Sequence, residues 1–149
     1  MWINKQIIII IIIFVVILYI FNLFMPTTIS NEIIKYIDDE EIVKITYIID
    51  NVKTENEQYH ITDRDSISSL HNYFNSISIT RTLSIPHFKN DNSFLIFIYD
   101  KSGKMATIST QTSLDGELYF YIQSNKWYKV KENNSSYSIS KDIIDIIND

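Results

Sequence analysis

The chain has 149 residues, a formal net charge of −5 and no cysteine. Lack of cysteine excludes disulfides, thiolate metal sites, thiol catalysis and anchoring through a lipidated cysteine. Of the 13 Lys and Arg residues only Lys5 lies in the first 25 positions, so the remaining 124 residues hold 12 basic against 18 acidic side chains, a charge of −6. This acidic body disfavours nucleic-acid binding and flat docking on an anionic bilayer, because both need a basic surface. Its length suits a single domain.

A long apolar run predicts a transmembrane helix over residues 6–25, with the lipid bilayer as its partner. All residues from Ile7 to Met25 except Asn22 are apolar, and as a helix they would extend about 29 Å, close to the hydrocarbon thickness of a bilayer. No small-residue cleavage site follows, which favours an uncleaved anchor over the two alternatives, a cleaved signal peptide and a buried core helix. Because Lys5 precedes the run, the positive-inside rule predicts a cytoplasmic N-terminus, residues 1–25 serving as tail and anchor, and an extracytoplasmic body in the cell membrane.

Residues 26–40 are predicted to be a solvated linker that leads into a domain over residues 41–149. An acidic run ends this stretch and is typical of solvated chain. Ile33, Ile34 and Ile37 share one helical face, so a short helix is the alternative.

The first part of the domain has strand and helix patterns. Alternation of Val43, Ile45, Tyr47 and Ile49 with polar residues predicts a strand, and residues 59–61 can close a hairpin with it. A helix is then predicted over residues 63–76, with Thr62 or Asp63 as its cap. Its apolar stripe consists of Ile67, Leu70, Phe74 and Ile77. A strand over residues 78–83 and a loop over residues 84–92 follow.

From Ser93 onward, the pattern of the chain predicts an antiparallel meander. Gly103 supplies the positive φ of a hairpin that pairs Ile98 with Ala106 and Ile96 with Ile108. A turn at Asp115-Gly116 leads into a strand over residues 117–123. For the last hairpin, matching of faces predicts a loop over residues 124–126 that pairs Ile122 with Tyr128 and Phe120 with Val130. A short amphipathic helix over residues 140–149 closes the chain, through Ile143, Ile146 and Ile147.

Together these patterns predict an α+β fold. It consists of one N-terminal transmembrane helix and a small antiparallel-sheet domain of five to seven strands over residues 41–131. One helix packs on the sheet, and the short C-terminal helix completes the domain.

Three stretches carry a resemblance to known proteins: HITDRDSISSLHNYFNSISI at 60–79, FIYDKSGK at 97–104 and NKWYKV at 125–130. In this order behind an N-terminal anchor, they resemble small anchored extracytoplasmic proteins of unknown function from low-GC Gram-positive bacteria. The resemblance covers about residues 57–131 and implies an α+β domain outside the membrane. It implies no catalytic residue.

No pattern in the chain indicates reaction chemistry. His60 with Asp63 and Asp65 has the residue types of a metal site, but ordinary helix capping produces the same arrangement. The acidic run Asp38 to Glu41 lacks the alternation and glycine of a calcium loop. No G-x-S-x-G motif is present, and two glycines are too few for a phosphate-binding loop. We therefore predict no catalytic residue, no metal, no cofactor and no enzymatic activity.

The last hairpin offers the most unusual predicted surface. Opposite its core face, Tyr119, Tyr121 and Trp127 lie beside Lys129 and Lys131. Tyrosine and tryptophan are enriched where proteins bind partners, which makes Tyr119, Tyr121, Trp127 and Lys129 the candidate partner-binding residues. The alternatives are cross-strand pairs that only stabilise the sheet, or a cover formed by the last helix. Leu95, Phe97 and Tyr99 raise the same question on the neighbouring hairpin.

The predicted function is a membrane-tethered extracytoplasmic binding module for a protein or cell-wall partner. Two other classes stay open. One is a cell-wall hydrolase with a carboxylate pair, whose geometry is a tertiary property. The other is an immunity-type structural membrane protein.

Overall fold

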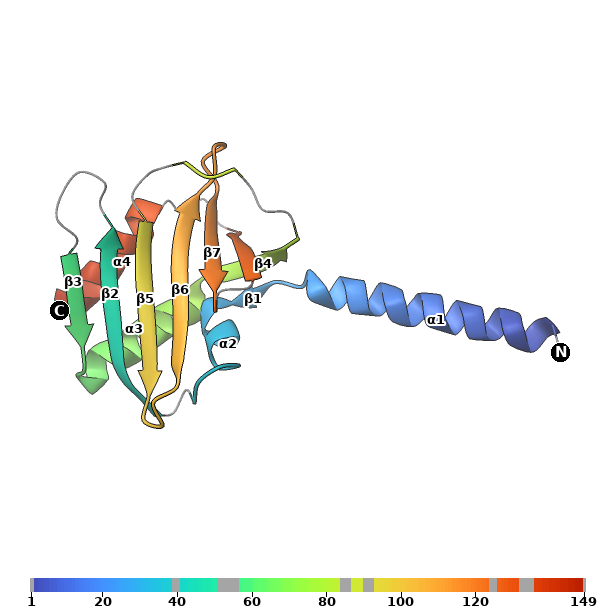
Figure 1. The fold of residues 1–149 in the computed structure, drawn as a ribbon, viewed down its shortest axis with the longest axis horizontal. Helices are drawn as coiled ribbons and strands as arrows, with labels where there is room; N and C mark the ends of the chain where they lie inside the picture. The colour runs from blue at the N-terminus through green and yellow to red at the C-terminus, as the bar shows by residue number, and fades with distance from the viewer. Residues whose placement is uncertain are drawn as a thin grey trace.

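The computed structural model describes residues 2–38, 41–50, 57–83, 87–89, 93–123, 126–131 and 136–148. In this part of the chain one long helix, α1, extends away from a domain built on an eight-stranded antiparallel sheet (Figure 1). The predicted α+β class, with an apolar N-terminal helix, an antiparallel sheet and a C-terminal helix, is confirmed.

Helix α1 (Trp2–Leu23) is formed by the apolar run. Its segment Lys5–Leu23 is long and apolar enough to cross a membrane, and none of that segment is buried against the rest of the protein. The isoleucines from Ile7 to Ile13 are 49–65% exposed. A helix that is apolar on all sides and unburied fits membrane anchoring, as an anchor or as a signal sequence, and the alternative of a buried core helix is wrong.

The segment predicted as a linker is instead part of the domain in its described residues. Strand β1 (Thr27–Thr28) pairs with β4 (Ser78–Thr82), so the sheet begins directly after α1. The three residues between α1 and β1 can span at most about 10 Å. The domain is therefore held close to the end of α1.

Helix α2 (Ile29–Ile33) explains why this segment is not solvated. The hydroxyl of Thr28 accepts a hydrogen bond from the backbone N–H of Asn31 and caps the helix. Ile29, Ile33 and Ile37 recur at intervals of four and are all buried in the core. Ile34, which the predicted helical face included, is 43% exposed. Burial of these three isoleucines stabilises the packed arrangement over a solvated chain.

The sheet has the strand order β1-β4-β8-β7-β6-β5-β2-β3. Seven of its strands lie within residues 41–131, at the upper end of the predicted five to seven, and β1 adds an eighth. Besides β1 and β4, the strands are β2 (Ile42–Asp50), β3 (Glu57–Ile61), β5 (Ser93–Asp100), β6 (Met105–Thr112), β7 (Leu118–Ile122) and β8 (Lys126–Val130).

Most predicted features of the strands are confirmed. Ile98 pairs with Ala106 and Ile96 with Ile108, and Gly103 has a φ of 85° in the turn between them. The turn at residues 115–116 is also present, with Gly116 at a φ of 86°. In β2, however, a bulge shifts the register after Ile42 and leaves Val43 44% exposed, outside the predicted apolar face.

The register predicted for the last hairpin is wrong by two residues. Phe120 pairs with Tyr128, and Ile122 pairs with Lys126. The backbone N–H of Gln123 donates a hydrogen bond to the carbonyl of Thr107. The side-chain oxygen of Gln123 accepts a second hydrogen bond from the backbone N–H of Thr107. Gln123 itself has a φ of 52°, which is not a strand conformation, so β7 ends at Ile122 and the loop starts one residue earlier than predicted. Residues 124–125 of that loop lie outside the described residues.

Helices α3 (Arg64–Ser76) and α4 (Ser136–Asn148) lie behind the sheet in Figure 1 and close the core. Asp63 caps α3, because its carboxylate accepts a hydrogen bond of 2.7 Å from the backbone N–H of Ser66. This hydrogen bond lowers the pKa of the Asp63 carboxyl. The predicted stripe of α3 is buried, and α4, which begins before its predicted start, buries Ile143 as expected. The loop predicted over residues 84–92 falls largely outside the described residues, as does the polar stretch 51–56.

Candidate functional site

Within the described chain, the helices of the domain pack on one face of the sheet and leave the other without a helix (Figure 1). In β5 the residues Phe94, Ile96 and Ile98 are at most 2% exposed, whereas those between them are half-buried. We call the helix-free side the open face. One row of it runs across five strands, since each of the following residues pairs with the next: Ile48, Leu95, Ser109, Tyr121 and Trp127.

An aromatic patch lies at the β7–β8 end of the open face. Tyr121 and Trp127 are cross-strand partners whose rings stack, with centroids 4.5 Å apart and an angle of 28°. The ring of Phe88 also packs on the indole of Trp127, with ring centroids 4.6 Å apart and an angle of 30° between the ring planes. We call Phe88, Tyr121 and Trp127 the aromatic patch. All three side chains are half-buried, so they remain partly accessible.

Tyr119, also predicted as a partner-binding residue, lies on the same face but is only 8% exposed. Phe88 packs against it edge-on, with ring centroids 6.0 Å apart. Its hydroxyl donates to Glu117 at 2.9 Å, and burial together with this bond raises the pKa of Tyr119 to about 12. Its ring is therefore covered and cannot stack on a partner.

Lys129 is exposed but already has an anionic partner. Its ammonium group forms an ion pair with Glu117, the carboxylate that also accepts from Tyr119. The hydrogen bonds from Lys129 and Tyr119 lower the pKa of Glu117. The positive charge of Lys129 beside the aromatic rings is thus largely neutralised.

The alternatives for the aromatic residues are partly resolved by this geometry. The stacked pair Tyr121–Trp127 does stabilise the sheet as a cross-strand pair. Helix α4 does not cover it, because α4 packs on the opposite face, where Ile139 and Ile143 are buried in the core and Ser140 lies 2.5 Å from the hydroxyl of Tyr47. Phe88, rather than the last helix, is what packs on Trp127.

The second predicted group, on β5, also lies on the open face. Phe97 and Tyr99 are half-buried, and the ammonium of Lys44 lies 5.6 Å from the ring centroid of Tyr99. Between this group and the aromatic patch, β6 presents the short side chains of Thr107 and Ser109. Aromatic groups on either side of short hydroxyl side chains make this face suited to stacking and hydrogen bonding.

The residues considered for metal or acid–base chemistry each have other hydrogen-bond partners in the structure. His60 Nδ1 lies 3.2 Å from the Thr46 hydroxyl, while Asp63 caps α3. No three His, Asp or Glu side chains of the described residues lie close enough together to hold a metal ion. The two buried carboxylates, Glu32 and Asp100, each accept hydrogen bonds from several donors within the domain. The absence of catalytic residues and metals stays a prediction.

Phe88 is the residue of this face that the sequence did not indicate. Its position is fixed by the backbone N–H of Lys89, which donates to the Thr112 carbonyl at 2.8 Å, and by a bridge between Phe88 and Ser113. The one available signal was a lone aromatic residue in an otherwise polar stretch.

Comparisons with protein-family models, curated proteins and solved structures gave no match for this chain. The resemblance to small anchored Gram-positive proteins therefore stays a prediction.

Proposed function

We propose that this chain is a membrane-tethered binding module whose open face captures a protein or cell-wall partner outside the cytoplasm. The observation that carries the proposal is the stacked Tyr121–Trp127 pair, half-buried on a face that no described helix covers. Aromatic rings contribute most of the binding energy in many interfaces, because they bury a large area at a small entropic cost.

The short connection between α1 and β1 supports a tethered function. Three residues separate the helix from the sheet, so the domain stays at the membrane surface. Confinement raises its effective concentration toward partners at that surface. The positive-inside rule, applied to Lys5, puts the domain outside the cytoplasm.

Capture of partners by the full chain, tagged at its C-terminus and crosslinked in its own membrane, tests the proposal. Replacement of Tyr121→Ala with Trp127→Ala should lower the yield of every specific partner at least about tenfold, as expected for hot-spot aromatics. The matched control replaces Ile34→Ala and Leu114→Ala, two exposed apolar residues outside the patch, and should capture normally. Unchanged capture by the aromatic variant would refute the open face as the binding site.

A replacement of residues 1–25 by an unrelated anchor separates this proposal from an immunity-type structural role. A tethered module should keep its partners after the exchange. Loss of function in a correctly inserted protein would instead show that the native anchor acts specifically.

A further inference from the structure

A cavity of about 430 Å³ lies where α1 meets the domain. Its walls come from the end of α1, from α2 and its following residues, and from strands β1, β4 and β8 at one end of the sheet. Asn22 and Met25 contribute on the α1 side, and Lys35, Arg81, Lys126 and Tyr128 on the domain side. This volume is within the range of small-molecule sites.

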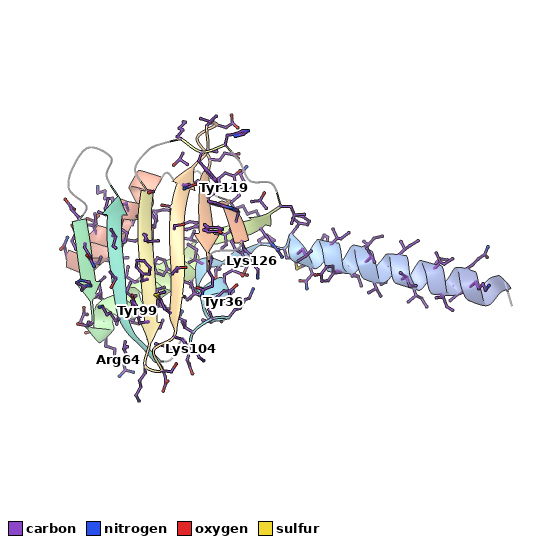
Figure 2. The ribbon with its side chains drawn as sticks, in the orientation of Figure 1. Tyr36, Arg64, Tyr99, Lys104, Tyr119 and Lys126 are labelled. Carbon is purple, nitrogen blue, oxygen red and sulfur yellow. The ribbon has the colours of Figure 1, made fainter. Side chains whose placement is uncertain are left out.

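The sheet register brings three of these side chains to the cavity. Arg81 of β4 pairs with Tyr128 of β8, so the two side chains share one face of the sheet. Lys126 is two residues before Tyr128 and lies on the same face, since side chains alternate along a strand. Figure 2 shows Lys126 on the side of the domain from which α1 leaves.

The charge of the cavity is opposite to that of the chain. Lys35, Arg81 and Lys126 supply three positive charges, against the one carboxylate of Glu32. Both oxygens of Glu32 are already occupied, Oε1 by the Lys35 ammonium at 2.5 Å and Oε2 by the Tyr128 hydroxyl at 2.5 Å. Within the described residues Arg81 and Lys126 form no ion pair. The cavity therefore has a surplus of positive charge in a protein of net charge −5.

We infer that this cavity binds the phosphate group of an anionic membrane lipid. Guanidinium and ammonium groups are the preferred protein ligands of phosphate, and Arg81 can bind two phosphate oxygens at once. The cavity is lined by the last residues of the apolar helix, which is where lipid headgroups lie if α1 spans the bilayer. The acyl chains would then continue along α1. This inference rests on the membrane position of α1 and not on the proposed partner-binding face.

The test uses the full chain in detergent, with bound phosphatidylglycerol or phosphatidylcholine counted by native mass spectrometry. The native chain should retain phosphatidylglycerol about tenfold more strongly, and the variant Arg81→Gln with Lys126→Gln should lose that preference, as expected when charge-assisted hydrogen bonds are removed. The control Lys101→Gln with Lys141→Gln has the same change in charge at exposed positions outside the cavity and should keep the preference.

A single variant keeps the inference testable if the double variant folds poorly. Lys126→Gln replaces a half-exposed side chain and should by itself weaken the preference about threefold. Equal retention of the two lipids by the native chain, or an unchanged preference in Lys126→Gln, would overturn the inference. Soluble glycerol phosphate, added as a competitor, should not displace the lipid. Displacement would assign the site to a free phosphate and overturn the lipid assignment. None of these measurements involves Tyr121 or Trp127, so they are independent of the proposed partner-binding function.

Discussion

Tyr128 donates a hydrogen bond of 2.5 Å to Glu32 Oε2, and both side chains are buried. The bond joins the segment that follows α1 to the strand β8. Burial, reinforced by this bond to Glu32, raises the pKa of Tyr128 well above its ordinary value of 10.0. The connection between α1 and the domain is three residues long, and the segment after it is hydrogen-bonded to the sheet through Glu32. Both features limit how far the domain can move from α1.

Tyr128→Phe should destabilise the domain by about 1–3 kcal/mol, because it leaves one oxygen of a buried carboxylate without a donor. The measurement is urea unfolding of the full chain in detergent, followed by near-ultraviolet circular dichroism. Tyr99→Phe removes a hydroxyl from a half-buried ring of the open face and should change the free energy of unfolding by less than about 0.5 kcal/mol. Equal effects of the two substitutions would mean that the Glu32 bond adds nothing to stability.

The sequence predicts local pairing well and long-range contacts poorly. The β5–β6 hairpin was predictable because Gly103 marks its turn and one apolar face sets its register. The register of the β7–β8 hairpin was not, because a shift of two residues leaves every side chain on the same face. That choice depends on Gln123, whose contacts with Thr107 join residues from different hairpins.

The same limit applies to the candidate site. Alternation along β7 and β8 correctly places Tyr121 and Trp127 away from the core. It cannot say what packs on them, and the contact of Phe88 with Trp127 depends on a segment 39 residues away. Burial of Tyr119 and neutralisation of Lys129 are consequences of such tertiary contacts.

Leu70→Ala should cost about 2–5 kcal/mol of unfolding free energy, because Leu70 is 1% exposed and its removal leaves a cavity between α3 and the sheet. Urea unfolding of the full chain in detergent measures the loss. The neighbouring exposed residue provides the control, since Ser69→Ala should change stability by about 0.5 kcal/mol or less. A loss near zero for Leu70→Ala would show that this helix face is not tightly packed.

Asp100→Asn should reduce the dependence of stability on pH below about pH 4. The Asp100 carboxylate accepts hydrogen bonds from the Ser102 hydroxyl and from the backbone N–H groups of Lys104 and Asp38. These bonds, that of Ser102 above all, lower its pKa below the ordinary value of 3.8. The ionised form is favoured by folding, so its contribution is present above pH 3.8 and is lost as the pH falls through the lower folded value.

Unfolding curves between pH 2 and pH 7 measure this dependence. Asp115→Asn changes an exposed carboxyl of the next turn and should keep the slope of the native protein. The prediction for Asp100 fails if both variants show the native slope.

Cysteine labelling should establish the topology, because the natural chain contains no cysteine. Lys101→Cys introduces a thiol at an exposed position of the β5–β6 turn, and Asn4→Cys introduces one ahead of the apolar run. If α1 is an uncleaved anchor with its N-terminus in the cytoplasm, a membrane-impermeant maleimide should label Lys101→Cys in intact cells. The same reagent should label Asn4→Cys only after the cells are permeabilised. If only Asn4→Cys is labelled in intact cells, the chain has the opposite orientation, with its N-terminus outside the cytoplasm. A mature protein that has lost residue 4, with a new N-terminus near Thr27, would identify the apolar run as a cleaved signal peptide.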